Sequence, residues 1–256
     1  MTTQTIPWHE DDSFWQTWGP ILFSETRKAA ATEQVDRIIT LAGIPPQACV
    51  LDLCCGVGRH SLALARRGYR VTGVDRTTVY LKQASEKATE EGLDIEFIRD
   101  DMRTFCRPDS FDVTLNLFTS FGFFADQSED RKVVLNVYRS LRNDGVFILD
   151  MSGKEIIART FQERAWNEAD GVIWLQERKL SQDWSWIENR WILLKENRRY
   201  EDNLGHRLYS AAELKTLLES CDFKDINIYG DFDGNPYDHT AHRLVAVAHK
   251  RKDGNR

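Results

Sequence analysis

Val50-Leu51-Asp52-Leu53-Cys54-Cys55-Gly56-Val57-Gly58-Arg59-His60 is the stretch that decides the fold. The apolar run over 49–53 predicts a short strand, the glycines predict a tight loop, and the small and apolar residues over 61–67 predict a helix. Glycines let a backbone approach a ligand closely and present free N–H groups to it. A Gly-x-Gly loop alone is a weak signal, because a tight strand-to-helix turn needs glycines for steric reasons as well.

The centre of the chain continues this alternation of strand and helix. Strands are expected over 70–74, 95–98, 111–117 and 145–151, and helices over 78–91 and 128–141. Such alternation predicts an α/β, Rossmann-like, doubly wound and mostly parallel sheet that helices cover on both faces.

The chain beyond residue 151 has a different pattern. Strands are expected over 172–180 and 186–198, and a reversal is expected at 203–205, before residues 207–209. Ser210 and Glu213 form a capping-box pattern for a helix over 211–221. The strands expected over 226–229 and 244–248 are joined by a loop too short for a helix, so they should be antiparallel.

The composition is that of an ordinary globular enzyme. The 34 Lys and Arg against 40 Asp and Glu give a net charge of −6, which disfavours a nucleic-acid partner. The chain has no apolar run of membrane-spanning length and no secretion signal at residues 1–12, so neither a membrane nor an export role is expected. Its five cysteines, odd in number and scattered, suit free thiols in a cytoplasmic protein. No feature of the sequence indicates an oligomeric state.

The neighbours of the glycine loop favour one class of ligand. A dinucleotide site needs a third glycine where this chain has Ser61, and Asp52 would repel a pyrophosphate. The same carboxylate suits the cationic part of S-adenosylmethionine. Asp75, at the end of the second predicted strand, is placed to accept hydrogen bonds from ribose hydroxyls, although it could also cap the helix that follows.

The third predicted strand ends in Asp100-Asp101-Met102. A side-chain acceptor for an adenine amine, followed by an apolar residue against the ring, fits this place, and Asp101 is preferred because Met102 follows it directly. Three such elements at the carboxyl ends of consecutive strands agree with the rule for open α/β sheets.

These residues resemble the class I S-adenosylmethionine-dependent methyltransferases. The resemblance runs through residues 51–75, 99–103, 111–124 and 141–151, and residues 230–250 resemble the final strand pair of that family. The nearest subgroup comprises bacterial enzymes that methylate small molecules, often at nitrogen, and carry a β-rich cap after the fifth strand. The resemblance implies one methyltransferase domain over 1–256, with a helical lid over 1–45, a cofactor-binding core over 46–152, a cap over 165–209, and the last helix and closing strands over 210–250.

The resemblance also implies where the cofactor lies. The residues expected to bind it are Arg27, Asp52, Cys54, Gly56, Gly58, Asp75, Arg76, Asp101, Met102, Asn116, Leu117 and Phe118. The loop and Asp52 would hold the amino-acid part, and Arg27 is a candidate for its carboxylate, although it could equally be a surface charge. Cys54 stands where the family often has glycine, and its side chain is small enough to be tolerated.

The sequence says less about the site of the methyl acceptor than about the cofactor site. Methyl transfer depends largely on positioning and water exclusion, and a neutral amine needs no strong base, so a nitrogen acceptor is favoured over oxygen. His206, Arg207 and Tyr209 are the catalytic candidates, and no metal site is predicted. Aromatic residues that could contact a small-molecule acceptor, or simply join the cap to the sheet, are Phe118, Phe121, Phe123, Phe124, Trp184, Trp186 and Trp191.

Two other functions fit parts of this pattern. A non-catalytic protein that binds S-adenosylmethionine or S-adenosylhomocysteine would keep the same loop and carboxylates. An NAD-dependent oxidoreductase is the less favoured alternative, because Ser61 and Asp52 argue against a pyrophosphate.

Overall fold

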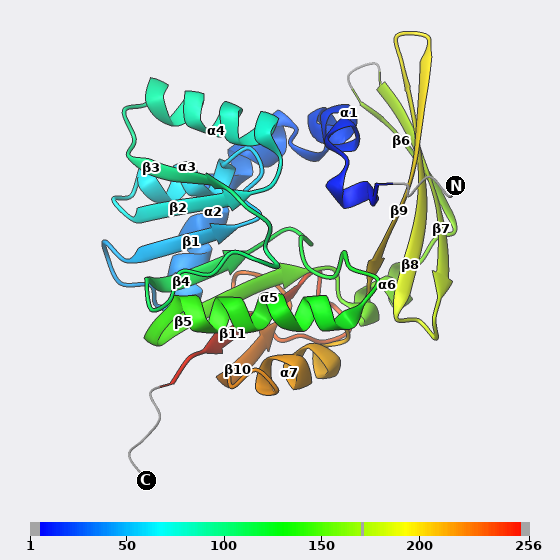
Figure 1. Cartoon of the computed structure of the whole chain (residues 1–256). Helices are drawn as coiled ribbons and strands as arrows, with labels where there is room; N and C mark the ends of the chain where they lie inside the picture. Colours follow the sequence, from blue (N-terminus) through cyan, green and yellow to red (C-terminus); the bar gives the residue numbers. More distant parts are fainter. Residues whose placement is uncertain (1–5, 170–171, 252–256) are drawn as a thin grey trace, which may run out of the picture.

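Seven strands form a mostly parallel sheet through the centre of the molecule, here described from a computed structural model of residues 6–169 and 172–251 (Figure 1). The strand order is β10-β11-β5-β4-β1-β2-β3, and β11 runs antiparallel to both β5 and β10. The strands are β1 (Cys49–Leu53), β2 (Arg70–Asp75), β3 (Ile95–Arg99), β4 (Phe111–Asn116), β5 (Leu141–Met151), β10 (Lys224–Tyr229) and β11 (Leu244–His249). This arrangement confirms the predicted Rossmann-like sheet, with its switch point between β1 and β4.

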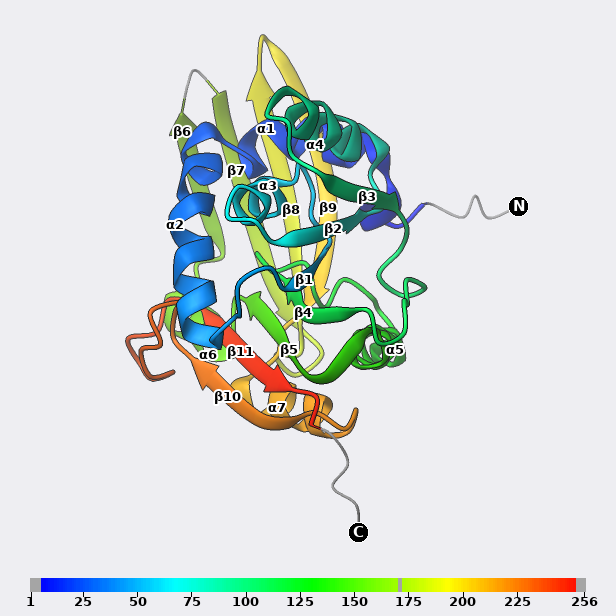
Figure 2. The same cartoon turned by 90° about the vertical axis from the view of Figure 1, so that its left-hand side faces the viewer.

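Helices cover both faces of this sheet because the side chains of each strand alternate between them. On one face, α2 (Glu25–Ala42) and α3 (Arg59–Ala65) pack through Val35 and Ala63 against Val50. On the other face, α5 (Gln127–Ser140) and α7 (Ala211–Glu219) pack against Leu51 and its neighbours. The helix α4 (Thr78–Glu90) lies beside β3, and Figure 2 shows α2 along one side of the molecule.

The remaining strands form a separate antiparallel sheet, which we call the cap. It consists of β6 (Arg164–Ala169), β7 (Val172–Ser181), β8 (Trp186–Lys195) and β9 (Arg198–Arg207) in sequence order, and α6 (Lys154–Thr160) connects it to β5. The cap stands apart from the central sheet and faces it across the molecule (Figure 1). The sequence indicated β7 and β8 but not β6 or α6.

The predicted reversal at 203–205 is wrong. The chain reverses earlier, at Glu196 and Asn197, which both have positive φ angles, and β9 then runs without a break to Arg207. Gly205 lies inside this strand because the indole of Trp186 packs over it: a Cβ at Gly205 would come within 2.5 Å of that ring. The glycine therefore makes room for an aromatic ring, and it does not mark a turn.

Other predicted boundaries shift by only a few residues, apart from the start of β5. This strand begins at Leu141, directly after α5, and the residue Asp144 within it has a φ of 63°. The capping box that begins α7 is confirmed, since Ser210 and Glu213 bind each other's backbone N–H groups.

The N-terminal segment lies between the central sheet and the cap (Figure 1). It contains the short 3-10 helix η1 (Trp8–Glu10), α1 (Asp12–Leu22) and the start of α2, which carries Arg27. Phe14 and Trp18 of α1 are buried against Leu193 and Leu204 of the cap. No helix in the described part of the chain is long and apolar enough to span a membrane.

Candidate functional site

A cavity of about 580 Å³ lies between the carboxyl ends of the parallel strands, the N-terminal segment and the inner face of the cap. Its floor contains Asp52, Cys54, Gly56, Asp75, Asp101 and Met102, all predicted for the site. Arg27, Arg76, Leu117 and Phe118 also line it. The strand ends, which the sequence places far apart, therefore open into one cavity, as the open α/β sheet requires.

The glycine loop is held in a conformation that few residues other than glycine adopt. Cys54, Gly56 and Gly58 all have positive φ angles, of 65°, 55° and 73°. A Cβ at Gly56 would meet the ring of Phe23 at 2.8 Å. Gly58 does not line the cavity; a Cβ there would meet that of Ala84 at 2.8 Å, so this glycine lets α4 pack against the loop.

Asp52 ends β1 and is buried beneath the loop. Its Oδ2 accepts a hydrogen bond from the Ser61 hydroxyl at 2.6 Å. Burial raises the pKa of the Asp52 carboxyl to about 6, against the opposing effect of the Ser61 hydrogen bond. Ser61, which replaces the third glycine of a dinucleotide motif, thus fixes the orientation of this carboxyl group.

Asp75 ends β2 and connects the loop to the next helix. Its Oδ2 accepts from the Gly56 N–H and its Oδ1 from the Thr77 N–H, both at 2.8 Å. A carboxylate has about four acceptor positions, so each oxygen can still accept one hydrogen bond from a ligand in the cavity. Both roles considered for Asp75, ribose acceptor and organiser of the next helix, are compatible with this geometry. Burial raises the pKa of its carboxyl.

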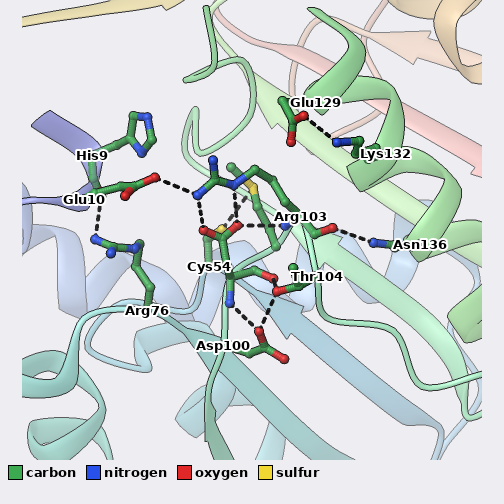
Figure 3. Close-up of polar contacts among 12 residues, drawn as sticks. His9, Glu10, Cys54, Arg76, Asp100, Arg103, Thr104, Glu129, Lys132 and Asn136 are labelled. Atoms are coloured by element: carbon green, nitrogen blue, oxygen red, sulfur yellow. Dashed lines mark hydrogen bonds and ion pairs between the residues drawn. The ribbon is translucent and has the colours of Figure 1, made fainter. Parts of the chain in front are cut away.

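The turn after β3 is held by Arg103, which contacts Asp101 and the N-terminal segment together (Figure 3). The Arg103 guanidinium donates to Asp101 Oδ2 at 2.6 Å and to Glu10 Oε1 at 2.7 Å. Although burial by itself raises the pKa of Asp101, the hydrogen bonds from Arg103 hold it below its usual value. Asp100 accepts from the Asp101 N–H at 2.7 Å, which makes it a structural residue of the turn.

Met102 is buried at the edge of this turn. Its Sδ lies 3.5 Å from Cys54 Sγ, and both side chains line the cavity. An adenine ring next to Asp101 would therefore find an apolar, sulfur-rich surface.

Three arginines surround the ring of Phe118, a residue with a φ of 65°. The guanidinium carbons of Arg27, Arg59 and Arg243 lie 4.9, 4.5 and 5.8 Å from the ring centre. Arg243 is paired with Asp150 at 2.6 Å, whereas Arg27 and Arg59 form no ion pair with any described residue. Burial lowers the pKa of both, that of Arg59 to about 10. Two partly desolvated guanidinium groups, without an ion pair among the described residues, therefore line the cavity at a place where an anionic group could bind.

Besides Gly58, three of the predicted site residues lie outside the cavity. Asn116 is buried in β4, where its Nδ2 donates to the Leu53 carbonyl at 3.2 Å. Tyr209 and Arg207 both contact the buried Asp130, whose Oδ2 is 2.7 Å from the Tyr209 hydroxyl and 3.3 Å from Arg207 Nε. These two catalytic candidates join the cap to α5 and do not face the cavity.

His206 is the one catalytic candidate that lines the cavity. Burial lowers the pKa of its imidazole to about 4. The side chain is therefore neutral near pH 7 and holds a proton weakly.

The predicted aromatic residues divide between the cavity and the protein core. Phe123, Phe124 and Trp191 line the cavity together with Phe118. Phe121 is fully buried beside Tyr209, Trp184 packs near Phe161 with 43% of its surface exposed, and Trp186 covers Gly205.

Sequence reasoning missed several residues that line the cavity. They include Arg59 and Arg243, several residues of the N-terminal segment, and the inward-facing residues of β7 and β8: Trp174, Gln176, Arg178, Ile187 and Asn189. The period-2 pattern of these strands was the signal available, because it places every second residue on one face. No group of three or more His, Cys, Asp or Glu side chains that could hold a metal ion is present within residues 6–169 and 172–251.

Comparisons with known proteins agree with this geometry. Residues 50–145 match the family model described as a methyltransferase domain. The chain is 26% identical to "Putative methyltransferase YqeM" of Bacillus subtilis over 82% of this chain and 87% of that protein. Among solved structures, an S-adenosylmethionine-dependent methyltransferase from Clostridium acetobutylicum has a TM-score of 0.77 at 15% identity, covering 94% of this chain and 99% of that one. CalS10 of Micromonospora echinaspora, described as an amino pentose methyltransferase bound to S-adenosylmethionine, has a TM-score of 0.67 at 19% identity, covering 92% and 96%.

Proposed function

We propose that the chain, whose residues 50–145 match a methyltransferase domain, transfers a methyl group from S-adenosylmethionine to a small-molecule amine. The observation that carries the proposal is the convergence of Asp52, Asp75 and Asp101, from the ends of three strands, on one cavity beside a glycine loop. Each carboxylate matches a different part of the cofactor.

The residues present fit this cofactor. Gly56 has no side chain, and the ring of Phe23 leaves no space for one. The backbone at Gly56 can therefore approach a ligand closely. Arg27 and Arg59 are suited to the methionyl carboxylate, Asp52 to the adjacent positive charge, and Asp75 to the ribose hydroxyls.

The reaction makes limited demands on the protein. When bound, S-adenosylmethionine supplies an electrophilic methyl group: the acceptor nitrogen forms a bond to the methyl carbon with its lone pair, and the carbon–sulfur bond breaks with its electrons going to sulfur. The nitrogen then releases a proton to water. The aromatic walls at Phe123, Phe124 and Trp191 exclude water and orient the acceptor.

We prefer a nitrogen acceptor over an oxygen acceptor because His206 is a weak base. A hydroxyl acceptor needs a base, and an imidazole with a pKa of about 4 is a weak one. A neutral amine has no such requirement. The resemblance in fold to KedS8 of Streptoalloteichus, which is described as a sugar N-methyltransferase, supports the same choice.

Calorimetry with S-adenosylmethionine, S-adenosylhomocysteine and NAD tests the cofactor assignment. We expect the first two to bind and Asp75→Ala to weaken binding by about tenfold or more, because it removes acceptors for charge-assisted hydrogen bonds. Asp233→Ala, on the exposed loop after β10, is the matched control and should bind normally.

Turnover is tested by S-adenosylhomocysteine release with a panel of amines and hydroxyl compounds. Binding of NAD alone would refute the cofactor assignment. Binding of S-adenosylmethionine without turnover of any acceptor would favour a non-catalytic binding protein.

A further inference from the structure

The inner face of the cap forms the roof of the cavity. Alternation along the strands points Gln176 and Arg178 of β7, Asn189 and Trp191 of β8, and His206 of β9 to the same side. Arg178 lies directly opposite Asn189, and Gln176 directly opposite Trp191. Three polar side chains thus sit in adjacent positions on a face that is otherwise largely aromatic and aliphatic.

Arg178 differs from Arg190 in the same sheet because no carboxylate of a described residue pairs with it. Arg190 pairs with Glu177 at 2.8 Å and with Glu201 at 2.6 Å on the outer face. Arg178 faces inward; its side chain donates to Gln176 Oε1 and forms no ion pair with any described residue. Burial lowers the pKa of its guanidinium, and no neighbouring acid opposes that effect. A desolvated cation without a counter-charge has a strong preference for an anionic ligand.

Asn189 provides a second unused group beside this cation. The side chain is 7% exposed, lines the cavity, and makes no hydrogen bond with any described residue. The indole Nε1 of Trp191, two residues along the same strand, is likewise buried without an acceptor. Buried polar groups are normally hydrogen-bonded, so unused donors beside an unpaired guanidinium indicate a place for a ligand acceptor.

We propose that the methyl acceptor carries a carboxylate in addition to its amine, and that Arg178 and Asn189 bind this carboxylate at the roof of the cavity. The inference rests on the proposed function, since it names the substrate class of the same site. A carboxylate suits the planar fork of an arginine and carries a single charge. Among the described residues of the cap that line the cavity, Arg178 is the one cation, which matches that single charge and not the greater charge of a phosphate. The neighbouring Trp174 and Ile187 suit an apolar or aromatic body.

The roof residues are also reachable from outside. A second hollow, of about 850 Å³, is lined by Arg178 and Asn189 as well as by Trp8, Phe123 and Leu204. Because the two hollows share these residues, Arg178 stands where an anionic acceptor would arrive from solvent.

Benzoate and benzamide are matched probes for the carboxylate, since they differ in charge but hardly in shape. Each is titrated by calorimetry into the full chain saturated with S-adenosylhomocysteine. We expect benzoate to bind more tightly by about tenfold or more, because only the anion forms charge-assisted hydrogen bonds with the guanidinium. Arg178→Met and Arg178→Gln should remove this difference, and Arg178→Lys should keep part of it.

Lys195→Met is the matched control, because it removes the same charge from an exposed residue of the cap that lines neither hollow. It should leave the benzoate preference unchanged. Equal affinity for the two probes, absence of binding by both, or an unchanged preference in the folded Arg178 variants overturns the proposal.

A kinetic measurement separates this proposal from the proposed function. Amino carboxylates and their amides are compared as acceptors by S-adenosylhomocysteine release, and Arg178→Met should raise the KM of the carboxylates while leaving that of the amides unchanged. Methylation of the amides as efficiently as of the carboxylates overturns the carboxylate assignment but upholds methyl transfer. A benzoate preference without turnover of any acceptor upholds the anion site and refutes the proposed function.

Discussion

Asp52 shows how one side chain combines a structural and a chemical role. It is buried beneath the glycine loop, its Oδ2 is fixed by the Ser61 hydroxyl, and burial raises its pKa to about 6. The carboxyl group therefore changes its charge just below neutral pH, at the place where the proposed cofactor is positive.

Cofactor binding should depend on pH through this residue. Only the ionised carboxylate attracts the cationic cofactor, so affinity should fall as the pH drops through 6, and S-adenosylmethionine should bind about tenfold more weakly at pH 5 than at pH 7. Asp52→Asn should bind weakly at both pH values, because its side chain is always neutral. Calorimetry at the two pH values measures the affinity for S-adenosylmethionine. If the affinity of Asp52→Asn depends on pH as strongly as that of the native chain, the prediction is wrong. Asp233→Asn, on the surface, should behave like the native chain.

The sequence predicted individual residues well where the backbone conformation is tied to a motif. Asp52, Gly56 and Asp75 follow from a strand, a loop and a strand end, and the structure places all three at the cavity. Sequence reasoning misplaced Arg207 and Tyr209, because the direction of a side chain at the end of a strand depends on what packs around it. Their partner Asp130 lies far earlier in the chain, and no local pattern connects them.

At the scale of elements, η1 links three parts of the molecule although it has only three residues. Trp8 Nε1 donates to the Gly205 carbonyl of the cap at 3.1 Å, and Glu10 accepts from Arg103 of the central domain. Arg76, at the end of β2, donates to the His9 carbonyl at 3.0 Å. This short helix therefore fastens the N-terminal segment across the cavity (Figure 3).

Trp8→Phe should loosen this helix locally without unfolding the protein. The phenyl ring keeps contacts with the neighbouring aromatic rings but cannot donate to Gly205, which should cost about 1 kcal/mol. Hydrogen–deuterium exchange should show faster exchange of the amides around residues 8–11. Trp184→Phe, which alters an exposed indole, is the control, and equal exchange in the two variants would contradict the role of the Trp8 hydrogen bond.

The elements of the central sheet were predictable, whereas η1 and the hairpin between β8 and β9 were not. The strands of the central sheet and the capping box of α7 could be recognised because each has a local physical cause. The η1 helix is too short for a periodic pattern, and the hairpin at Glu196 and Asn197 has no glycine to mark its positive φ angles. Gly205 misled the prediction because its purpose is to accommodate Trp186.

At the scale of the whole molecule, the cap and the central domain are joined by a buried polar contact. Asp130 of α5 accepts from the Tyr209 hydroxyl and pairs with Arg207, while its Oδ1 has no partner. Burial raises the pKa of this carboxyl to about 6. The contact fixes the cap where its last strand returns to the central domain.

Tyr209→Phe should therefore lower stability and leave catalysis intact. Removal of a hydrogen bond to a buried carboxyl group should reduce the free energy of unfolding by about 1–3 kcal/mol, as measured by urea denaturation. The kcat and KM should stay at their native values, because Tyr209 lies outside the cavity. Tyr200→Phe, at a partly exposed position of β9, should change neither quantity. A large loss of kcat in a stable Tyr209→Phe protein would restore Tyr209 as a catalytic candidate.

The cap occupies one continuous stretch of the chain, residues 164–207, whereas the floor of the cavity is assembled from the ends of several separate strands. A gene segment encoding the cap could therefore be exchanged as a single cassette between two cut points, one after α6 and one before α7. On the proposed function, such a chimera would take its methyl-donor site from one parent and its acceptor site from the other. The part of the site that would bind the methyl donor and the part that would bind the acceptor could therefore be changed separately.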